Sequence, residues 1–171
     1  KTIADIGIIG LPNAGKSSLL AAITNASPKI ANYQFTTLNP NLGVASYDNK
    51  EITLADIPGL IEGAHKGTGL GIQFLKHVER CKSLLHMIDI TNEDIKKSYK
   101  QVKTELKNYS SKLSKKKEII VLNKIDLISK NKLKQIVDNF SKNTKSEIMT
   151  VSTLKKNSIS KVKAKLISYA S

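Results

Sequence analysis

The chain has 171 residues and carries 28 Lys and Arg against 14 Asp and Glu, a formal net charge of +14. With 40% hydrophobic residues it is too apolar for wholesale disorder, and it is long enough for one domain with a substantial core. No uninterrupted apolar run approaches the roughly 20 residues of a membrane-spanning helix. The single cysteine, Cys81, excludes an internal disulfide framework and is compatible with a reducing compartment.

The positive charge is concentrated in one half of the chain. Residues 1–95 have a net charge of −1, whereas residues 96–171 have a net charge of +15. Such asymmetry is typical of a surface that faces a polyanion such as RNA. A general preference for lysine on solvated helix faces is the other explanation, and both stay open. Aromatic residues, at 5%, are too few for a platform on which single-stranded nucleic acid stacks.

Apolar runs alternate with helical periods along the chain, which predicts one α/β domain with a mostly parallel, six-stranded sheet flanked by helices. The expected strands are Ile3–Ile9, Gly43–Tyr47, Glu51–Asp56, Leu84–Asp89, Glu118–Leu122 and Ile148–Val151. The expected helices are Ser17–Asn25, Ile72–Cys81, Asp94–Ser110, Ser129–Asn139 and Ser158–Tyr169. Residues 29–42 show no clean period, so we expect a long loop there.

The first strand is followed by the pattern G-x-x-x-x-G-K-[ST], which is typical of a phosphate-binding loop. Its two glycines allow close approach to a phosphate, and the loop amides attract the anion together with the N-terminus of the next helix. Lys16 supplies a cation for the outer phosphates, and the Ser17 hydroxyl supplies a ligand for Mg²⁺. A glycine-rich turn with a surface lysine is the weaker alternative. The predicted loop residues are Gly10, Leu11, Pro12, Asn13, Ala14, Gly15, Lys16 and Ser17.

The third expected strand ends in the pattern D-x-x-G. The carboxylate of Asp56 is placed to reach the magnesium shell, and the amide of Gly59 is placed to face the γ-phosphate of a nucleotide. An ordinary turn at the end of a strand is the alternative, and the phosphate loop upstream makes it weak. The four residues are Asp56, Ile57, Pro58 and Gly59.

The irregular loop before this strand carries two adjacent threonines. One of their hydroxyls is expected to complete the magnesium coordination, and we prefer Thr37 to Thr36, so that Ser17, Thr37 and Asp56 hold the metal. Both loops should be held while the γ-phosphate is present and released after its loss. The loop residues concerned are Phe35, Thr36, Thr37 and Leu38.

The apolar strand near residue 120 is followed by Asn123, Lys124, Ile125 and Asp126. An ionised Asp126 can accept hydrogen bonds from the N1–H and N2–H₂ groups of guanine, whereas adenine offers neither donor and would leave the carboxylate unpaired. The stem of Lys124 can lie along the base, and Asn123 can join this loop to the phosphate loop.

The segment after the last strand is the expected source of a backbone N–H group for the base oxygen. An ordinary turn is the alternative explanation of this short stretch. Its residues are Ser152, Thr153 and Leu154.

These five elements, in this order, resemble a translation-factor-class GTPase domain, and the sequence segments around and between them resemble the Obg family. The segments that carry the second resemblance are Phe35–Gly43, Asp56–Ala64 and Gly69–Cys81. The resemblance implies a Ras-like P-loop NTPase G domain over residues 1–171 that slowly hydrolyses GTP to GDP and phosphate with Mg²⁺. It also implies a conformational switch in large ribosomal subunit assembly, with rRNA or the subunit as partner, a cytoplasmic location and a response to guanosine tetraphosphate.

The resemblance further implies a longer protein, with a glycine-rich N-terminal domain and often a C-terminal domain. We expect the isolated domain to be monomeric. One departure from the family is Thr153, which stands where many relatives carry Ala.

The glutamine that orients the attacking water in Ras-like enzymes is replaced here by Leu60, which makes no hydrogen bond, so turnover should be slow. We favour a monovalent cation, K⁺, held beside the phosphates by the Asn13 amide oxygen and carbonyls of residues 29–37. Asn13 as a plain loop residue is the alternative. The expected catalytic residues are therefore Lys16, Thr37, Gly59 and Asn13.

Two other functions compete with a GTPase. The first is an RNA- or ribosome-docking module in which nucleotide merely orders the loops and hydrolysis is secondary. The second is an ATP-preferring relative, which Asn123 and Asp126 disfavour. Outside these motifs, His86 is expected to be a hydrogen-bonded core residue and Cys81 a packing residue.

Overall fold

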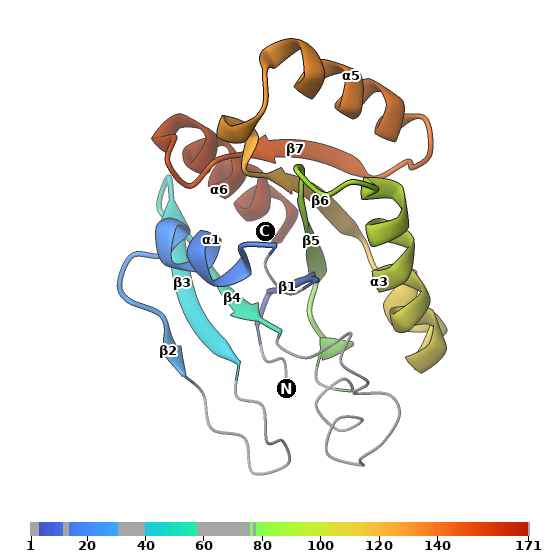
Figure 1. Ribbon diagram of the computed structural model, residues 1–171. Helices are drawn as coiled ribbons and strands as arrows, with labels where there is room; N and C mark the ends of the chain where they lie inside the picture. The colour runs from blue at the N-terminus through green and yellow to red at the C-terminus, as the bar shows by residue number, and fades with distance from the viewer. Residues whose placement is uncertain (1–3, 12–13, 31–39, 58–75, 77, 171) are drawn as a thin grey trace.

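The computed structural model describes residues 4–11, 14–30, 40–57, 76 and 78–170 (Figure 1). Within them, seven strands form one sheet in the order β2-β3-β4-β1-β5-β6-β7. β1, β4, β5, β6 and β7 run parallel, whereas β3 pairs antiparallel with β4 and with the short β2. The strands are β1 Ile6–Gly10, β2 Lys29–Ile30, β3 Asn41–Tyr47, β4 Lys50–Asp56, β5 Ser83–Asp89, β6 Glu118–Asn123 and β7 Glu147–Val151.

Helices cover both faces of the sheet (Figure 1). α1 and α6 pack on one face, and α3 with the short α4 packs on the other, where α5 covers the end formed by β5 and β6. The helices are α1 Lys16–Ile23, α3 Ile95–Tyr109, α4 Ser111–Ser114, α5 Lys130–Ser141 and α6 Lys156–Ala170, and the 3₁₀ helix η2 covers Ile125–Leu127.

The central strands are apolar along their whole length because both of their faces are buried. In β1, Ile6 and Ile8 lie in the core under α1 and α6, whereas Ile9 lies in the core under α3 and α4. β6 alternates in the same way, with Val121 toward α6 and Leu122 toward α5. This continuous burial is what the uninterrupted apolar runs indicated.

The predicted α/β class and mostly parallel sheet are confirmed, but seven strands rather than six lie in the sheet among the described residues. The additional strand, β2, has two exposed residues that pair with Leu42 and Asn41 inside the segment predicted as a loop. A pair of residues at a sheet edge carries no period that a sequence pattern could reveal. Asp48 and Asn49 join β3 to β4 with φ of 53° and 63°, the left-handed values that a two-residue hairpin turn requires.

Helix boundaries lie close to the predicted ones. Of the helix expected over Ile72–Cys81, only Lys76 and residues 78–81 belong to the described part, and Lys76 and Val78 are helical there. Cys81 is buried, as expected of a packing residue, and burial raises the pKa of its thiol to about 11. In the described part of the chain, no helix combines the length and the hydrophobicity needed to cross a bilayer.

Candidate functional site: a nucleotide-binding edge

The predicted motifs meet at one edge of the sheet because they follow parallel strands. β1 ends at Gly10, β4 at Asp56 and β6 at Asn123, so all three carboxyl ends point the same way. β5 and β7 end at this edge as well, where Asp89 and Val151 each pair with Asn123. The carboxyl edge of a parallel sheet is where open α/β folds bind ligands.

The phosphate loop leaves no room for side chains at its two glycines. A Cβ atom at Gly10 would lie 2.6 Å from the Met87 carbonyl oxygen. Gly15 has a φ of 97°, in the left-handed region, and a Cβ there would lie 2.2 Å from Nδ2 of Asn123. The loop therefore rests directly on β5 and on the end of β6.

Gly15 is also the residue from which α1 begins, so this helix starts without a side-chain cap. The side chains of Asp94, Ser110 and Ser129 cap α3, α4 and α5 by accepting a backbone N–H bond. As far as the described residues go, the first amides of α1 are thus left for another acceptor, and a phosphate at a helix N-terminus is a common one.

Lys16, the first residue of α1, lies across the mouth of the phosphate loop. Its ammonium donates a hydrogen bond to the Gly10 carbonyl oxygen at 3.2 Å and lies 4.0 Å from Oδ1 of Asp56. The side chain is 13% exposed. The cation is therefore held between the loop and a carboxylate, in reach of any anion in the loop.

Ser17 and Asp56 come from distant parts of the chain and are in contact. Ser17 Oγ donates to Asp56 Oδ2 at 2.9 Å, while Oδ1 is buried and accepts no hydrogen bond within the part of the chain that is described. A carboxylate and a hydroxyl are hard oxygen ligands of the kind that Mg²⁺ prefers, usually with several waters. The pair therefore fits a magnesium site.

Asn123 joins the second loop to the first. Its side-chain Nδ2 donates to the Ala14 carbonyl oxygen at 2.9 Å, a buried bond between residues 109 positions apart. The same nitrogen is the atom that a Cβ at Gly15 would meet. The two loops therefore share one contact, as the sequence indicated for Asn123.

Lys124 is held by a residue that the sequence analysis missed. Its backbone is left-handed, with a φ of 69°, and its ammonium donates to Asp89 Oδ2 at 2.8 Å. Burial acts to raise the pKa of Asp89, but hydrogen bonds from Lys124 and from the Thr91 hydroxyl and amide hold that pKa below its ordinary value. The missed signal is that Asp89, like Asp56, ends a buried parallel strand.

Asp126 lies exposed in η2, and its carboxylate is oriented by Ser152. Ser152 Oγ donates to Asp126 Oδ1 at 2.7 Å and accepts the Leu154 amide at 3.2 Å. The Ser152 amide donates to Ser158 Oγ at 3.1 Å. Ser152 was expected to offer a backbone donor to the base, whereas in the structure its hydroxyl positions the carboxylate and its amide is occupied.

The remaining residues of this loop face outward. Leu154 is 79% exposed and Thr153 is half-buried.

Two predicted site residues from the other loops are packed inside the protein. Ile57 is buried behind Asp56, and Leu11 packs against the core under α3. Several predicted site residues lie outside the described part of the chain, namely Pro12, Asn13, Phe35, Thr36, Thr37, Leu38, Pro58 and Gly59.

Comparisons with known proteins agree with this arrangement. Residues 5–124 match the family described as 50S ribosome-binding GTPase. The chain is 72% identical to the GTPase Obg of Pelagibacter ubique (strain HTCC1062), over 100% of this chain and 52% of that protein. It is 57% identical to the GTPase Obg of Ehrlichia canis (strain Jake), over 92% of this chain and 46% of that protein.

A solved structure shares the fold at low sequence identity. The cytosolic domain of the T. maritima FeoB iron transporter in its GMPPNP form has a TM-score of 0.73 and 21% identity, over 96% of this chain and 63% of that one. The chain spans about half the length of the curated relatives that it matches. Because the family match covers more than half of the chain, the chain belongs to the 50S ribosome-binding GTPases, as the resemblance of its motifs implied.

Proposed function

We propose that this domain binds GTP and GDP with Mg²⁺ and slowly hydrolyses GTP to GDP and phosphate. The observation that carries the proposal is the meeting of Lys16, Ser17 and Asp56 at the uncapped start of α1, with Ser17 Oγ 2.9 Å from the Asp56 carboxylate. A cation, a helix N-terminus and a hard-oxygen pair at one point suit a magnesium-bound triphosphate.

In this proposal the residues of the phosphate loop hold and orient the triphosphate. Lys16 pairs with the outer phosphates in place of its present acceptor at Gly10. Ser17, Asp56 and Thr37 would hold Mg²⁺, which would supply positive charge to the phosphates. Water attacks the γ-phosphorus, and the bond from that phosphorus to the β–γ bridging oxygen breaks, so that GDP leaves with this oxygen. The proton that the water loses is carried by the phosphate product. The amide of Gly59 would face the γ-phosphate. Leu60 cannot orient that water, so turnover is slow.

Guanine is selected by the carboxylate of Asp126. Its two oxygens accept the N1–H and N2–H₂ groups of the base, and Ser152 fixes their direction through the 2.7 Å bond to Oδ1. Lys124, held by Asp89, lies along the base, and the Thr153 amide donates to the base oxygen. Adenine would leave the carboxylate without donors, and each acceptor left unpaired costs about 1–3 kcal/mol of binding free energy.

We also propose a monovalent cation beside the phosphates. The Asn13 amide oxygen and carbonyls of residues 29–37 would hold K⁺, and the ion would supply positive charge where an arginine would otherwise act. Turnover should then be faster in KCl than in NaCl, and Asn13→Ala should remove that difference. Equal rates in the two salts would refute the role of K⁺ and would leave the rest of the proposed function unaffected.

We further propose a cellular role in which the bound nucleotide switches an interaction with the large ribosomal subunit during its assembly, in the cytoplasm and under the influence of guanosine tetraphosphate. The 50S ribosome-binding description of the matching family supports the choice of ribosomal partner. The competing role is a docking module on rRNA in which hydrolysis is secondary. Single-turnover hydrolysis of bound GTP, measured with and without large ribosomal subunits, separates the two. Absence of cleavage under both conditions favours the docking module.

The test of the core proposal is nucleotide binding and turnover by the purified chain with Mg²⁺ or with EDTA. Ser17→Ala should abolish the magnesium dependence of GTP affinity, because the metal loses one of its ligands. Ser18→Ala, an exposed neighbour in the same turn, is the matched control and should behave as the wild type. An unchanged magnesium response in the Ser17 variant would contradict the site.

A further inference from the structure

A lysine-rich cleft lies at the opposite edge of the sheet from the nucleotide site. It has a volume of about 410 Å³ and sits where β6 and β7 begin, at Glu118 and Glu147. Five lysines line it, and they come from α3, from the segment after α4 and from the loop before β7. We call it the lysine cleft, and its lysines are Lys103, Lys115, Lys116, Lys117 and Lys145.

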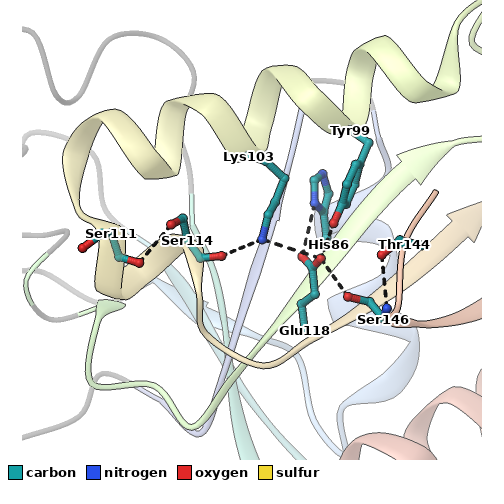
Figure 2. A network of polar contacts seen from close by, with 8 residues as sticks. All are labelled: His86, Tyr99, Lys103, Ser111, Ser114, Glu118, Thr144 and Ser146. Atoms are coloured by element: carbon teal, nitrogen blue, oxygen red, sulfur yellow. Dashed lines mark hydrogen bonds and ion pairs between the residues drawn. The ribbon is translucent and has the colours of Figure 1, made fainter.

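The buried carboxylate in this cleft is already surrounded by partners. Glu118 accepts hydrogen bonds from the hydroxyls of Tyr99 and Ser146, and the Lys103 ammonium lies 3.7 Å away (Figure 2). Burial acts to raise the pKa of Glu118, but His86, Tyr99 and Lys103 together hold it at about 2. Its negative charge is therefore engaged inside the protein and offers little to a ligand.

The second carboxylate is occupied in the same way. Glu147 accepts the Tyr169 hydroxyl at 2.7 Å and pairs with Lys165 at 2.9 Å. The ammonium of Lys117 lies 4.1 Å from the centroid of the Tyr169 ring. This contact with the ring face keeps the positive charge of Lys117 and fixes where it lies.

The lysines divide into two groups. Lys103 donates to the Ser114 carbonyl oxygen at 2.7 Å, and Lys116 donates to the carbonyl oxygens of Glu79 and Cys81, so these two brace the walls of the cleft. Lys115, Lys117 and Lys145 are exposed. Within the described residues, neither Lys115 nor Lys145 takes part in an ion pair.

The composition of the cleft favours a phosphate backbone over a protein partner. Protein interfaces are anchored by buried aromatic or large aliphatic side chains. Single-stranded nucleic acid needs rings on which bases stack, and the Tyr169 ring is covered by Lys117. Duplex RNA is recognised mainly by shape and by contacts to phosphate and sugar. The large apolar side chains that are exposed in the described part all lie outside the cleft, at Ile30, Val44, Tyr47, Leu127 and Leu154.

We propose that the lysine cleft binds the phosphate backbone of double-stranded RNA, with Lys115, Lys117 and Lys145 as the phosphate contacts. The choice of RNA over DNA rests on the ribosome-binding family described above. The cleft uses none of the nucleotide-site residues and lies at the other ends of the strands. RNA and nucleotide can therefore be bound at the same time.

The test measures binding of an RNA duplex of about 20 base pairs, longer than the roughly 16 that a double-stranded RNA-binding domain spans, by fluorescence anisotropy over a salt series. The variant K115Q/K117Q/K145Q removes three charges and keeps the side-chain stems. Its affinity should fall at least about tenfold near 100 mM salt, and the slope of log K against log salt should shrink by about 3. The matched control K130Q/K132Q/K134Q removes three exposed charges from α5 and should bind as the wild type.

Equal losses in the two triple variants, or no loss in either, would overturn the proposal, because the charge would then act without a specific surface. Tighter binding to poly-glutamate, to single-stranded RNA or to a DNA duplex of the same sequence would overturn the choice of partner. Lys145→Gln alone, expected to reduce the slope by about 1, serves if the triple variant folds poorly. Binding is measured without nucleotide, and GTP turnover is measured separately, so that failure of the GTPase proposal leaves this test intact.

Discussion

The carboxylates at the two edges of the sheet differ in how many hydrogen-bond and charge partners they have. At the carboxyl edge, Asp126 is exposed with one described partner, and Asp56 keeps a buried oxygen that accepts no hydrogen bond within the described chain. At the amino edge, Glu118 is surrounded by hydroxyls, an imidazole and an ammonium (Figure 2). At the first edge Asp89 is engaged by Lys124 and Thr91, but Asp56 and Asp126 keep acceptor capacity within the described chain. The second edge uses its carboxylates for its own framework and presents cations outward.

The largest effect is expected from a substitution at Gly15, at the carboxyl edge. Gly15→Ala places a Cβ 2.2 Å from the Asn123 amide nitrogen and forces alanine into a left-handed conformation. We expect a loss of about 2–4 kcal/mol of unfolding free energy together with loss of GDP binding. Urea unfolding and GDP titration measure the two. A variant that binds GDP normally would show that the contact between the two loops does not shape the phosphate site.

The next prediction tests the amino edge through the dependence of unfolding free energy on pH. Burial lowers the pKa of His86, so this imidazole stays neutral in the folded protein while the unfolded chain takes up a proton below about pH 6.5. Stability should therefore fall as the pH drops below 6.5, by at most about 1.4 kcal/mol per pH unit for one proton. Glu118, with its pKa lowered to about 2, contributes stability that is present above pH 4.5 and lost toward pH 2.

His86→Phe separates these two contributions. The phenyl ring can keep the stack on Tyr99, whose centroid lies 5.0 Å from that of the imidazole, but it cannot titrate. Urea midpoints between pH 7 and pH 5 should become flat in this variant. The loss of stability below pH 4.5 should become smaller but persist, because Tyr99 and Lys103 still lower the pKa of Glu118. An unchanged slope between pH 7 and pH 5 would assign that proton to another group.

A smaller effect is expected from Ser152→Ala, which sharpens the account of guanine recognition. The change removes the 2.7 Å bond that orients Asp126 but leaves the carboxylate in place. GDP affinity should fall by a factor of about 3–10, corresponding to a loss of about 0.5–1.5 kcal/mol. Ser152→Thr, which retains a hydroxyl, should recover most of that affinity. Equal affinities of the alanine variant and the wild type would show that this bond does not prepare the carboxylate for guanine.

The sequence was sufficient to predict which residues gather at the carboxyl edge. Lys16, Ser17, Asp56 and Asn123 each follow or end a strand, and parallel strands bring such positions to one edge. The pairing partners were not predictable in the same way. That Asp89 holds Lys124 depends on the left-handed backbone of Lys124, which no residue pattern before it indicates.

Other features needed the three-dimensional arrangement. The segment after β7 was expected to supply a backbone N–H to the base, and the structure shows that the Ser152 amide donates to Ser158 instead, which leaves that role to Thr153 or Leu154 as a prediction. His86 is buried as expected, yet its ring nitrogens form no hydrogen bond within the described residues, and its nearest partner is Glu118 at 3.7 Å. The charge of residues 96–171 was plain from composition, but its concentration in a cleft arises because β6 and β7 begin side by side.

The central claim is that the carboxylate of Asp126 selects guanine at the carboxyl edge. Asp126→Asn offers an amide that can donate to the 2-oxygen of xanthine and accept its N1–H, but cannot accept both guanine donors. The account predicts that GDP affinity of the purified chain falls roughly 100-fold or more, as expected for the loss of bonds to a charged group, while xanthosine diphosphate gains affinity. Unchanged GDP affinity with no gain for the xanthine nucleotide would contradict it.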